Sequence, residues 1–315
     1  MLELLRYDHG IYALDSGYIR PQLAAIHFIV ENDQVVIIDT ASHTSLPRVL
    51  EALQVLGLTP ANVAYVFLTH IHLDHAGGAG AMMQAFPEAR LVVHPRGAPH
   101  MVDPTKLFAA VGAVYGQEEA DRLYGHPVPV AADRIIAAGD GYIFDIAGRP
   151  LLCLDTPGHA RHHLCLRDTL SGGIFTGDIF GLSFRELDVD GRPSVIPTTT
   201  PTQFDPPVMH DSIDQILSYQ PEAVYLTHFA QVREVQRLGG ELHRLIDAHV
   251  AVAEQARDRG PEREAWIAEG LWALMDAEAA RQGWQLEREQ WREVLQSDIE
   301  LNAQGLSYWL DHAAS

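Results

Sequence analysis

Four side chains that can bind a metal ion fall within six residues of the chain. The segment reads Thr69-His70-Ile71-His72-Leu73-Asp74-His75-Ala76-Gly77-Gly78. Imidazole nitrogens and a carboxylate oxygen together suit zinc, iron or manganese. One histidine here would indicate only a solvated loop residue. Three histidines and an aspartate before a pair of glycines indicate a metal-binding loop.

A buried strand must deliver this loop. Residues 63–68 read Val-Ala-Tyr-Val-Phe-Leu, which has the length and composition of a strand. In an extended chain, side chains two residues apart share a face, so His70 and His72 should point to one side. Gly77 and Gly78 allow the backbone to pass close to the site without a Cβ clash.

Three later strand ends carry the same kinds of side chain. His159 lies in the turn Thr156-Pro157-Gly158-His159, Asp178 follows Thr176-Gly177, and His228 follows Leu226-Thr227. Each alone would be a loop histidine or a helix-capping aspartate. Four predicted strand ends that all deliver histidine or aspartate instead indicate one metal centre.

In this order, the motifs T-H-I-H-L-D-H-A-G-G, T-P-G-H, T-G-D and L-T-H-F resemble the metallo-β-lactamase superfamily in its dinuclear-hydrolase form. The resemblance covers about residues 11–230. It implies an α/β fold, the four-layer αββα metallo-β-lactamase sandwich. The purely helical pattern after Gly239-Gly240 adds a C-terminal helical extension. We expect the sandwich domain over 1–238 and the extension over 239–315. Asp39, in Ile37-Ile38-Asp39-Thr40, matches the upstream aspartate that supports the metal loop in this superfamily.

The resemblance also implies two divalent metal ions, with zinc as first choice and iron or manganese as alternatives. The ligands of the first ion would be His70, His72 and His159. Those of the second would be Asp74, His75 and His228, with Asp178 bridging both. A hydroxide held between the ions would be the nucleophile, because metal binding lowers the pKa of water from about 16 to about 7. Asp74 would orient that hydroxide.

The expected function is a metal-dependent hydrolase that acts on a small-molecule ester, thioester or lactone, in the glyoxalase II and lactonase-like branch. A phosphodiesterase and an iron-dependent sulfur dioxygenase-like oxidoreductase are the alternatives, and a metal-binding protein without turnover is a third. Glutathione is a poor candidate substrate, because the C-terminal region is acid-rich where the glyoxalase II group uses basic residues.

Substrate contacts are harder to assign. Phe184 and Arg185, shortly after Asp178, and Tyr225, shortly before His228, could touch the substrate or could simply pack. His162 and His163 could support the ligands or donate a proton, or could cover the start of a strand.

Composition narrows the partners. The 315 residues carry 42 acidic and 22 basic side chains, a net charge of −20. Lys106 is the only lysine, so nucleic acid is not an expected partner. No apolar run approaches the ~20 residues that cross a membrane, and the N-terminus lacks a secretory pattern. We expect no membrane association, a cytoplasmic location, and free thiols at Cys153 and Cys165.

Periodicity places the remaining elements. Strands at 23–30 and 34–39 form a hairpin, and a helix over 46–56 has Ser45 as its cap. An insertion over 95–133, with helices at 105–115 and 117–123, could roof the site. Further strands, expected as a meander, lie at 134–136, 142–145, 151–155, 163–166 and 173–176. Asp205 opens a helix over 208–219, before a strand at 223–226. Helices at 241–258, 262–281 and 286–312 form a cap or a homodimer interface.

Overall fold

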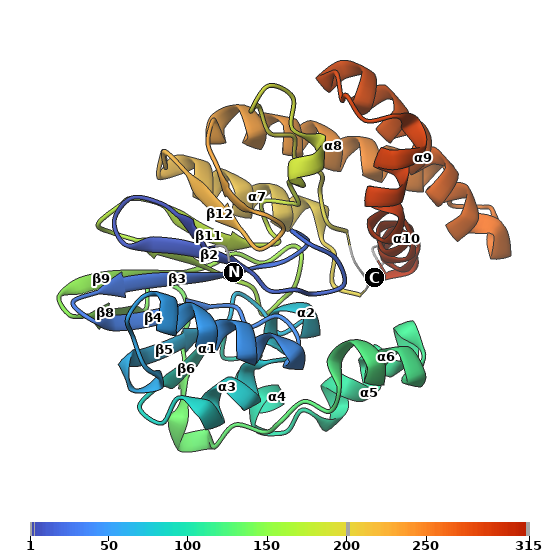
Figure 1. Cartoon of the computed structure of the whole chain (residues 1–315). Helices are drawn as coiled ribbons and strands as arrows, with labels where there is room; N and C mark the ends of the chain where they lie inside the picture. The colour runs from blue at the N-terminus through green and yellow to red at the C-terminus, as the bar shows by residue number, and fades with distance from the viewer. Residues whose placement is uncertain (1, 3, 200–201, 313–315) are drawn as a thin grey trace. The chain divides into compact units, whose positions relative to one another are not determined.

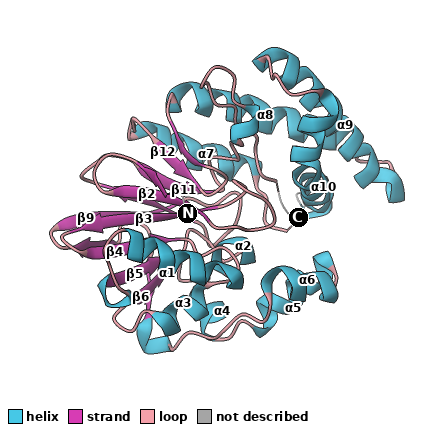
Figure 2. Cartoon of the chain, in the orientation of Figure 1, coloured by secondary structure: helices cyan, strands magenta, loops and turns pink. Residues whose placement is uncertain are grey.

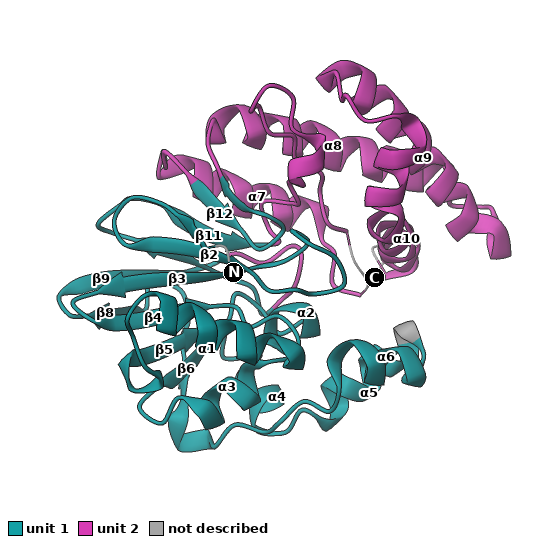
Figure 3. Ribbon diagram, in the orientation of Figure 1, with its two compact units in different colours: residues 1–155, 162–177, 224–231 teal, residues 156–161, 178–223, 232–315 magenta. Residues whose placement is uncertain are grey.

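The computed structural model describes residues 2, 4–199 and 202–312 and divides the chain into two compact units. Figure 3 shows unit 1 in teal (residues up to 155, 162–177 and 224–231) and unit 2 in magenta (156–161, 178–223 and from 232 onward). The predicted boundary after residue 238 falls inside helix α8 (Val235–Gln255). The division into a sandwich domain over 1–238 and a helical extension over 239–315 stays a prediction.

Unit 1 contains two mixed β-sheets (Figures 1 and 2). The described strands of the first sheet run in chain order: β1 (Leu4–Arg6), β2 (Ile11–Asp15), β3 (Ala25–Glu31), β4 (Gln34–Ile38), β5 (Val63–Phe67), β6 (Arg90–Val93) and β7 (Ile135–Ala137). Those of the second sheet are β8 (Ile143–Ile146), β9 (Arg149–Asp155), β10 (Leu164–Asp168), β11 (Ile174–Gly177), β12 (Val224–Leu226) and β13 (Ala230–Val232).

Alternation along β4 shows how the layers form. Val35 and Ile37 belong to the core shared with helices α1 (Leu46–Val55) and α3 (Ala79–Ala85). Val36 and Ile38 face the other way, into the core between the two sheets. A strand buried on both faces must be apolar throughout, which is why its sequence reads as a continuous hydrophobic run. The predicted class, two mixed sheets flanked by helices, is confirmed.

Parallel pairing gathers the functional loops. Strands β4, β5 and β6 are parallel, as are β11 and β12. Parallel strands end at the same edge of a sheet, which is where α/β proteins place their ligands. The loop after β5 leads into the short helix α2 (Leu73–Ala76), and the other predicted ligands also follow strands.

Two local predictions were wrong. The strand near 135 does not begin the meander: β7 pairs in parallel with β6 in the first sheet, and β8 to β11 form the meander. Ser45 precedes α1, but its hydroxyl donates to the carbonyls of Thr40 and Ser42 and so does not cap the helix. Asp205 does cap its helix, α7 (Pro206–Ser218), through the Val208 amide.

The insertion forms the helices α4 (Ala98–Val102), α5 (Thr105–Tyr115) and α6 (Gln117–Tyr124). Leu123 and Tyr124 of α6 pack in one apolar cluster with Tyr18 and with Leu73, which stands between His72 and Asp74. The Tyr18 and Tyr124 hydroxyls are 2.7 Å apart. The insertion therefore packs against Leu73, inside the loop of predicted ligands. That it roofs the site stays a prediction.

Unit 2 contains α7, α8 and the helices α9 (Arg263–Gln282) and α10 (Arg288–His312). The predicted trio of C-terminal helices is confirmed, although α8 begins before the Gly239-Gly240 pair. The helix includes these glycines. At Gly239 the Leu217 side chain of α7 packs so closely that a Cβ would lie 2.7 Å from it. Among the described residues, no helix is both long and apolar enough to span a membrane. Homodimer formation through these helices stays a prediction.

A buried ion pair joins neighbouring strands of the second sheet. Arg149 Nε and Nη2 donate to the two carboxylate oxygens of Asp168 at 2.9 and 2.6 Å, and Nη1 donates to the His9 carbonyl at 2.7 Å. His9 precedes β2, so this guanidinium also ties the two sheets together. Burial by itself raises the pKa of Asp168, but hydrogen bonds from Arg149 and Ser171 outweigh it and hold that pKa below its ordinary value.

Replacing Arg149 by methionine should lower the free energy of unfolding by about 3–5 kcal/mol at pH 7, because the Asp168 carboxylate is left buried without its cation. The stabilisation that a carboxyl with a lowered pKa provides is complete above about pH 4 and is lost as the pH falls. The difference in free energy of unfolding between wild type and Arg149→Met should therefore be smaller in acid. Urea denaturation of both proteins at pH 7 and pH 3.5 measures this difference. The control Arg122→Met, at an exposed ion pair, should change little; an equal loss there would contradict the prediction.

Candidate metal centre

Asp39 lies where several segments of unit 1 meet. It follows β4 with φ of +57°, and its side chain is buried. Oδ1 accepts the Thr69 N–H at 2.8 Å, and Oδ2 accepts the Thr227 hydroxyl and His75 Nδ1–H, each at 2.8 Å. Thr69 follows β5, and Thr227 follows β12. One carboxylate therefore fixes two strand ends and a predicted ligand.

The same contacts fix the tautomers of two predicted ligands. His75 Nδ1 faces the Asp39 carboxylate, and His228 Nδ1 is 2.6 Å from the Leu23 carbonyl oxygen. Both partners can only accept, so both Nδ1 atoms carry hydrogen. In a neutral imidazole the other nitrogen, Nε2, is then an acceptor, which is the form that binds a metal ion.

These acceptors converge on Asp74. Its Oδ2 lies 3.5 Å from His75 Nε2 and 3.4 Å from His228 Nε2. The ligand atoms of the three residues all lie within 4.8 Å of one another. A cation stabilises such a convergence of lone pairs, and two imidazoles with a carboxylate suit zinc, iron or manganese. The residues present therefore fit a divalent metal, and they are the set expected for the second ion.

His70 and His72 form a second convergence. His70 Nε2 is 2.9 Å from His72 Nδ1. Thr69 Oγ1 donates to Asp39 and so accepts from His70 Nδ1–H at 3.2 Å, which leaves His70 Nε2 as the acceptor. The chain can turn back closely behind this loop because residue 78 is glycine: a Cβ there would lie 2.7 Å from the Thr40 carbonyl oxygen.

The two predicted ligands in unit 2 lie beside each other. His159 Nε2 is 3.5 Å from Asp178 Oδ2. Thr198 Oγ1 donates to the Asp178 carbonyl at 3.2 Å and accepts His159 Nδ1–H at 2.9 Å, so His159 also keeps Nε2 as an acceptor. No motif in the sequence signals this hydroxyl. Shared coordination between these two residues and those of unit 1, with Asp178 as the bridge, stays a prediction.

Further histidines accompany the ligands in unit 1. The His162 ring lies 5.8 Å from that of His72, and burial, with a smaller contribution from His72, lowers the pKa of His162 to about 3. His162 is therefore neutral near pH 7. His94 accepts the Arg96 N–H at Nδ1 and places Nε2 3.4 Å from the Asp155 carboxylate. Nothing in the sequence signals this pair, which joins the ends of strands in different sheets.

The predicted substrate contacts make packing contacts. The Tyr225 ring stacks on Phe175 at 4.6 Å between the sheets, and its hydroxyl accepts from Gln231. Phe184 is buried, and Arg185 pairs with Asp188 at 3.2 Å. A role in substrate binding stays a prediction for all three.

The thiols match the expectation. Cys153 and Cys165 are buried and form no disulfide, and burial raises the pKa of Cys153 to about 12, far from that of a nucleophilic thiol.

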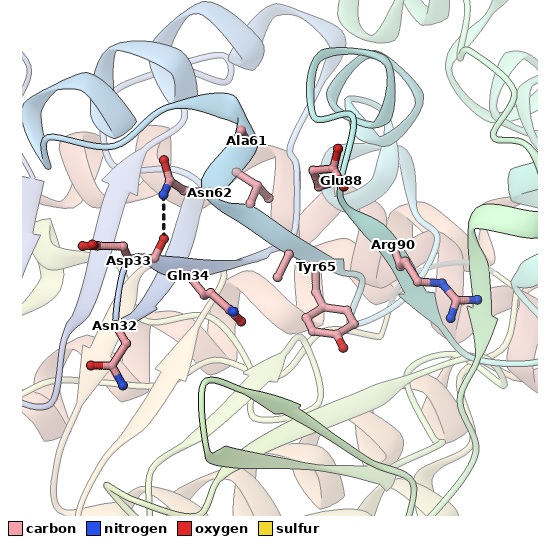
Figure 4. Close-up of a pocket in the computed structure, with 10 residues that line it drawn as sticks. Asn32, Asp33, Gln34, Ala61, Asn62, Tyr65, Glu88 and Arg90 are labelled. Carbon is pink, nitrogen blue, oxygen red and sulfur yellow. Dashed lines mark hydrogen bonds between the residues drawn. The ribbon is translucent and has the colours of Figure 1, made fainter.

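A hollow of about 420 Å³ lies at the other edge of the first sheet, where β4, β5 and β6 begin (Figure 4). Exposed Asp33, Glu88 and Arg90 line it, and Asn62 Nδ2 donates to the Asp33 carbonyl at 2.9 Å. Its charges are mixed, and none of the predicted ligands lines it. The predicted ligands His70, His72, Asp74 and His75 lie at the opposite edge, after β5 ends.

A profile of the metallo-β-lactamase superfamily matches residues 20–228, a span that contains all seven predicted ligands. The chain belongs to this superfamily. Among its relatives, the metallo-β-lactamase fold-containing protein ST1585 of Sulfurisphaera tokodaii is 25% identical over 228 residues, which are 70% of this chain and 78% of that protein. The crystal structure of ST1585, there assigned to Sulfolobus tokodaii, covers 95% of this chain and 99% of its own at a TM-score of 0.64 and 22% identity.

Two other relatives of the superfamily carry names of reactions. A hydroxyacylglutathione hydrolase of Synechococcus is 31% identical over 131 residues, 41% of this chain and 38% of that protein. An atrochrysone carboxyl ACP thioesterase of Aspergillus fumigatus is 30% identical over 116 residues, 37% of this chain and 27% of that protein. The match spans well under two thirds of either enzyme.

Replacing Asp39 by asparagine should weaken zinc binding by at least about tenfold, because the amide cannot accept all the hydrogen bonds that orient Thr69, His75 and Thr227. Changes to groups behind metal ligands typically cost 10–100-fold in affinity. Chelator competition measures the zinc dissociation constant. Asp33→Asn, in the exposed turn of the hairpin, is the matched control. Equal zinc affinity in the two variants would contradict the role of Asp39.

Proposed function

We propose that this superfamily member is a two-metal hydrolase that acts on a small-molecule ester, thioester or lactone. The observation that carries the proposal is the convergence of His75 Nε2 and His228 Nε2 on the Asp74 carboxylate, with both Nδ1–H groups held by acceptors behind them. We assign His70, His72 and His159 to one ion and Asp74, His75 and His228 to the other, with Asp178 as bridge. Zinc is our first choice of metal.

When bound, the ions would supply an activated water and would polarise the carbonyl that is attacked. The chain's own side chains do the rest. Asp74 can accept a proton from that water and orient it. His70, His75 and His159 are held in the Nε2-acceptor tautomer by Thr69, Asp39 and Thr198. No serine or cysteine nucleophile is needed.

The substrate class rests on two supports. Relatives named for a reaction include an atrochrysone carboxyl ACP thioesterase and a hydroxyacylglutathione hydrolase. A net charge of −20 disfavours nucleic acid and other polyanions. A small acyl compound satisfies both, and the apolar cluster of Tyr18, Leu73, Leu123 and Tyr124 beside the metal loop would limit water there.

Replacing Asp178 by alanine should remove at least one metal ion per chain and lower kcat/KM by more than about a hundredfold, because a bridging ligand contributes to both ions and groups behind ligands alone cost 10–100-fold. Elemental analysis gives the metal count, and a panel of thioester, lactone and phosphodiester substrates gives the activity. Asp211→Ala, at an exposed carboxylate of α7 in the same unit, is the control.

An unchanged metal count in Asp178→Ala would refute the bridging role. Turnover of phosphodiesters alone by the wild type would refute the proposed substrate class and favour the phosphodiesterase alternative.

A further inference from the structure

Residues 181–199, which follow Asp178, fold back on themselves through an antiparallel bridge between Leu182 and Ile196. Leu182 and Ile196 exchange two backbone hydrogen bonds at 2.8 and 2.9 Å, and the Gly181 N–H donates to the Asp178 carbonyl at 2.9 Å. Gly181 has φ of +76°, and a Cβ there would lie 2.5 Å from the Ile196 carbonyl oxygen. This approach requires glycine. It places the residues after Ile196 beside the predicted ligands of unit 2.

Thr198 is where the loop meets both ligands. Its hydroxyl bonds the Asp178 carbonyl and His159 Nδ1, and it is 3% exposed. A shift of Thr198 would therefore change the orientation and tautomer of His159 together. The contacts that hold Thr198 in place therefore control the orientation of His159 and Asp178.

Asn302, on α10, fixes the residues on both sides of Thr198. Its Oδ1 accepts the Thr199 N–H at 2.7 Å, and its Nδ2 donates to the Pro197 carbonyl at 3.0 Å. Its backbone carbonyl accepts the Thr199 hydroxyl at 3.0 Å. Asn302 is 1% exposed and Thr199 is fully buried, so water cannot replace these bonds.

An asparagine in the middle of a long helix needs a reason. Its helix propensity is poor, and burying its amide is costly unless every polar atom is bonded. Here the bonds go to the loop and not to a neighbouring helix. Two other side chains of the C-terminal region also hold this loop: Trp284 Nε1 donates to Ser194 Oγ at 3.0 Å, and Arg237 Nη2 donates to the Pro193 carbonyl at 3.0 Å.

We propose that Asn302 is a positioning residue for the metal centre: by clamping Pro197 and Thr199 it holds Thr198 where it orients His159 and the Asp178 backbone. Through this contact, helix α10 of the C-terminal extension supports the orientation of the predicted ligands in unit 2. This inference rests on the proposed metal centre and goes beyond it, because it assigns a function to a helix that contributes no ligand.

The test compares zinc affinity with stability. Asn302→Leu removes both side-chain bonds at similar volume and should raise the zinc dissociation constant about tenfold, the low end of the range for groups behind ligands. Thr198→Val should do the same, and Thr198→Ser, which keeps the hydroxyl, should bind like the wild type. Because Asn302 acts through Thr198, the double variant Asn302→Leu/Thr198→Val should lose little more than either single variant.

Leu295→Ala is the matched control, because it removes a fully buried side chain from the same helix. It should lower the Tm of the metal-free protein at least as far as Asn302→Leu while leaving the zinc dissociation constant within about twofold. Should Asn302→Leu fail to fold, Asn302→Asp keeps an acceptor for the Thr199 N–H but sets a carboxylate oxygen against the Pro197 carbonyl in place of the donor, and the same rise in dissociation constant is expected.

Wild-type zinc affinity in the folded Asn302 variant, or an equal loss of affinity in Leu295→Ala, would overturn the positioning role. Hydrolysis by the wild type, assayed in parallel, separates the two proposals. If the wild type binds zinc but turns over no substrate, the proposed hydrolase function is refuted and the role of Asn302 still stands. If the wild type is active and the Asn302 variants bind zinc like the wild type, the role of Asn302 is refuted and the hydrolase function stands.

Discussion

The buried carboxylate of Asp39 is the interaction on which the rest of unit 1 depends. A carboxylate with several donors around it is stable in a core, whereas any one of those donors left unpaired there would be costly. Its donors come from residues far apart in sequence: Thr69 after β5, His75 in α2, and Thr227 after β12. One side chain thus brings together segments of both sheets and sets the tautomer of a ligand. The adjacent His228 is held by the Leu23 carbonyl, which precedes β3.

The same logic recurs in unit 2 with different groups. A threonine hydroxyl does for His159 what the aspartate does for His75, and it is held in turn by a buried asparagine of α10. In each case the hydrogen bond at Nδ1 leaves Nε2 of the imidazole as the acceptor. Both units therefore prepare nitrogen acceptors through contacts that need no metal. Preorganisation of this kind lowers the entropy lost when a metal binds.

The candidate ligands of the first motif could be located in the fold from sequence because they directly follow a recognisable strand. An apolar strand must end somewhere, and His70 to His75 follow it directly. The assignment of strands to one sheet or the other was less predictable. A strand of three residues such as β7 carries too little pattern to choose between a meander and the first sheet, and the choice is made by its pairing with β6. Ser45 has the residue type of a cap, yet the nearby Thr40 carbonyl takes its hydroxyl.

The supporting residues were largely invisible for a similar reason. Thr198 and Asn302 are 104 positions apart, His94 and Asp155 lie on different sheets, and none of them belongs to a short motif. Their roles arise only when the chain brings them into contact. The exception is Asp39, which the family resemblance identified as a support for the metal loop.

The most direct measurement is the metal content of the wild-type chain after loading and dialysis, determined by elemental analysis with an assay for oxygen consumption alongside. A ligand set divided between two ions predicts two divalent ions per chain, with zinc as first choice. It also predicts ester or thioester hydrolysis without oxygen uptake. A single iron per chain with oxygen consumed on a persulfide would contradict it and would make the protein an oxygenase.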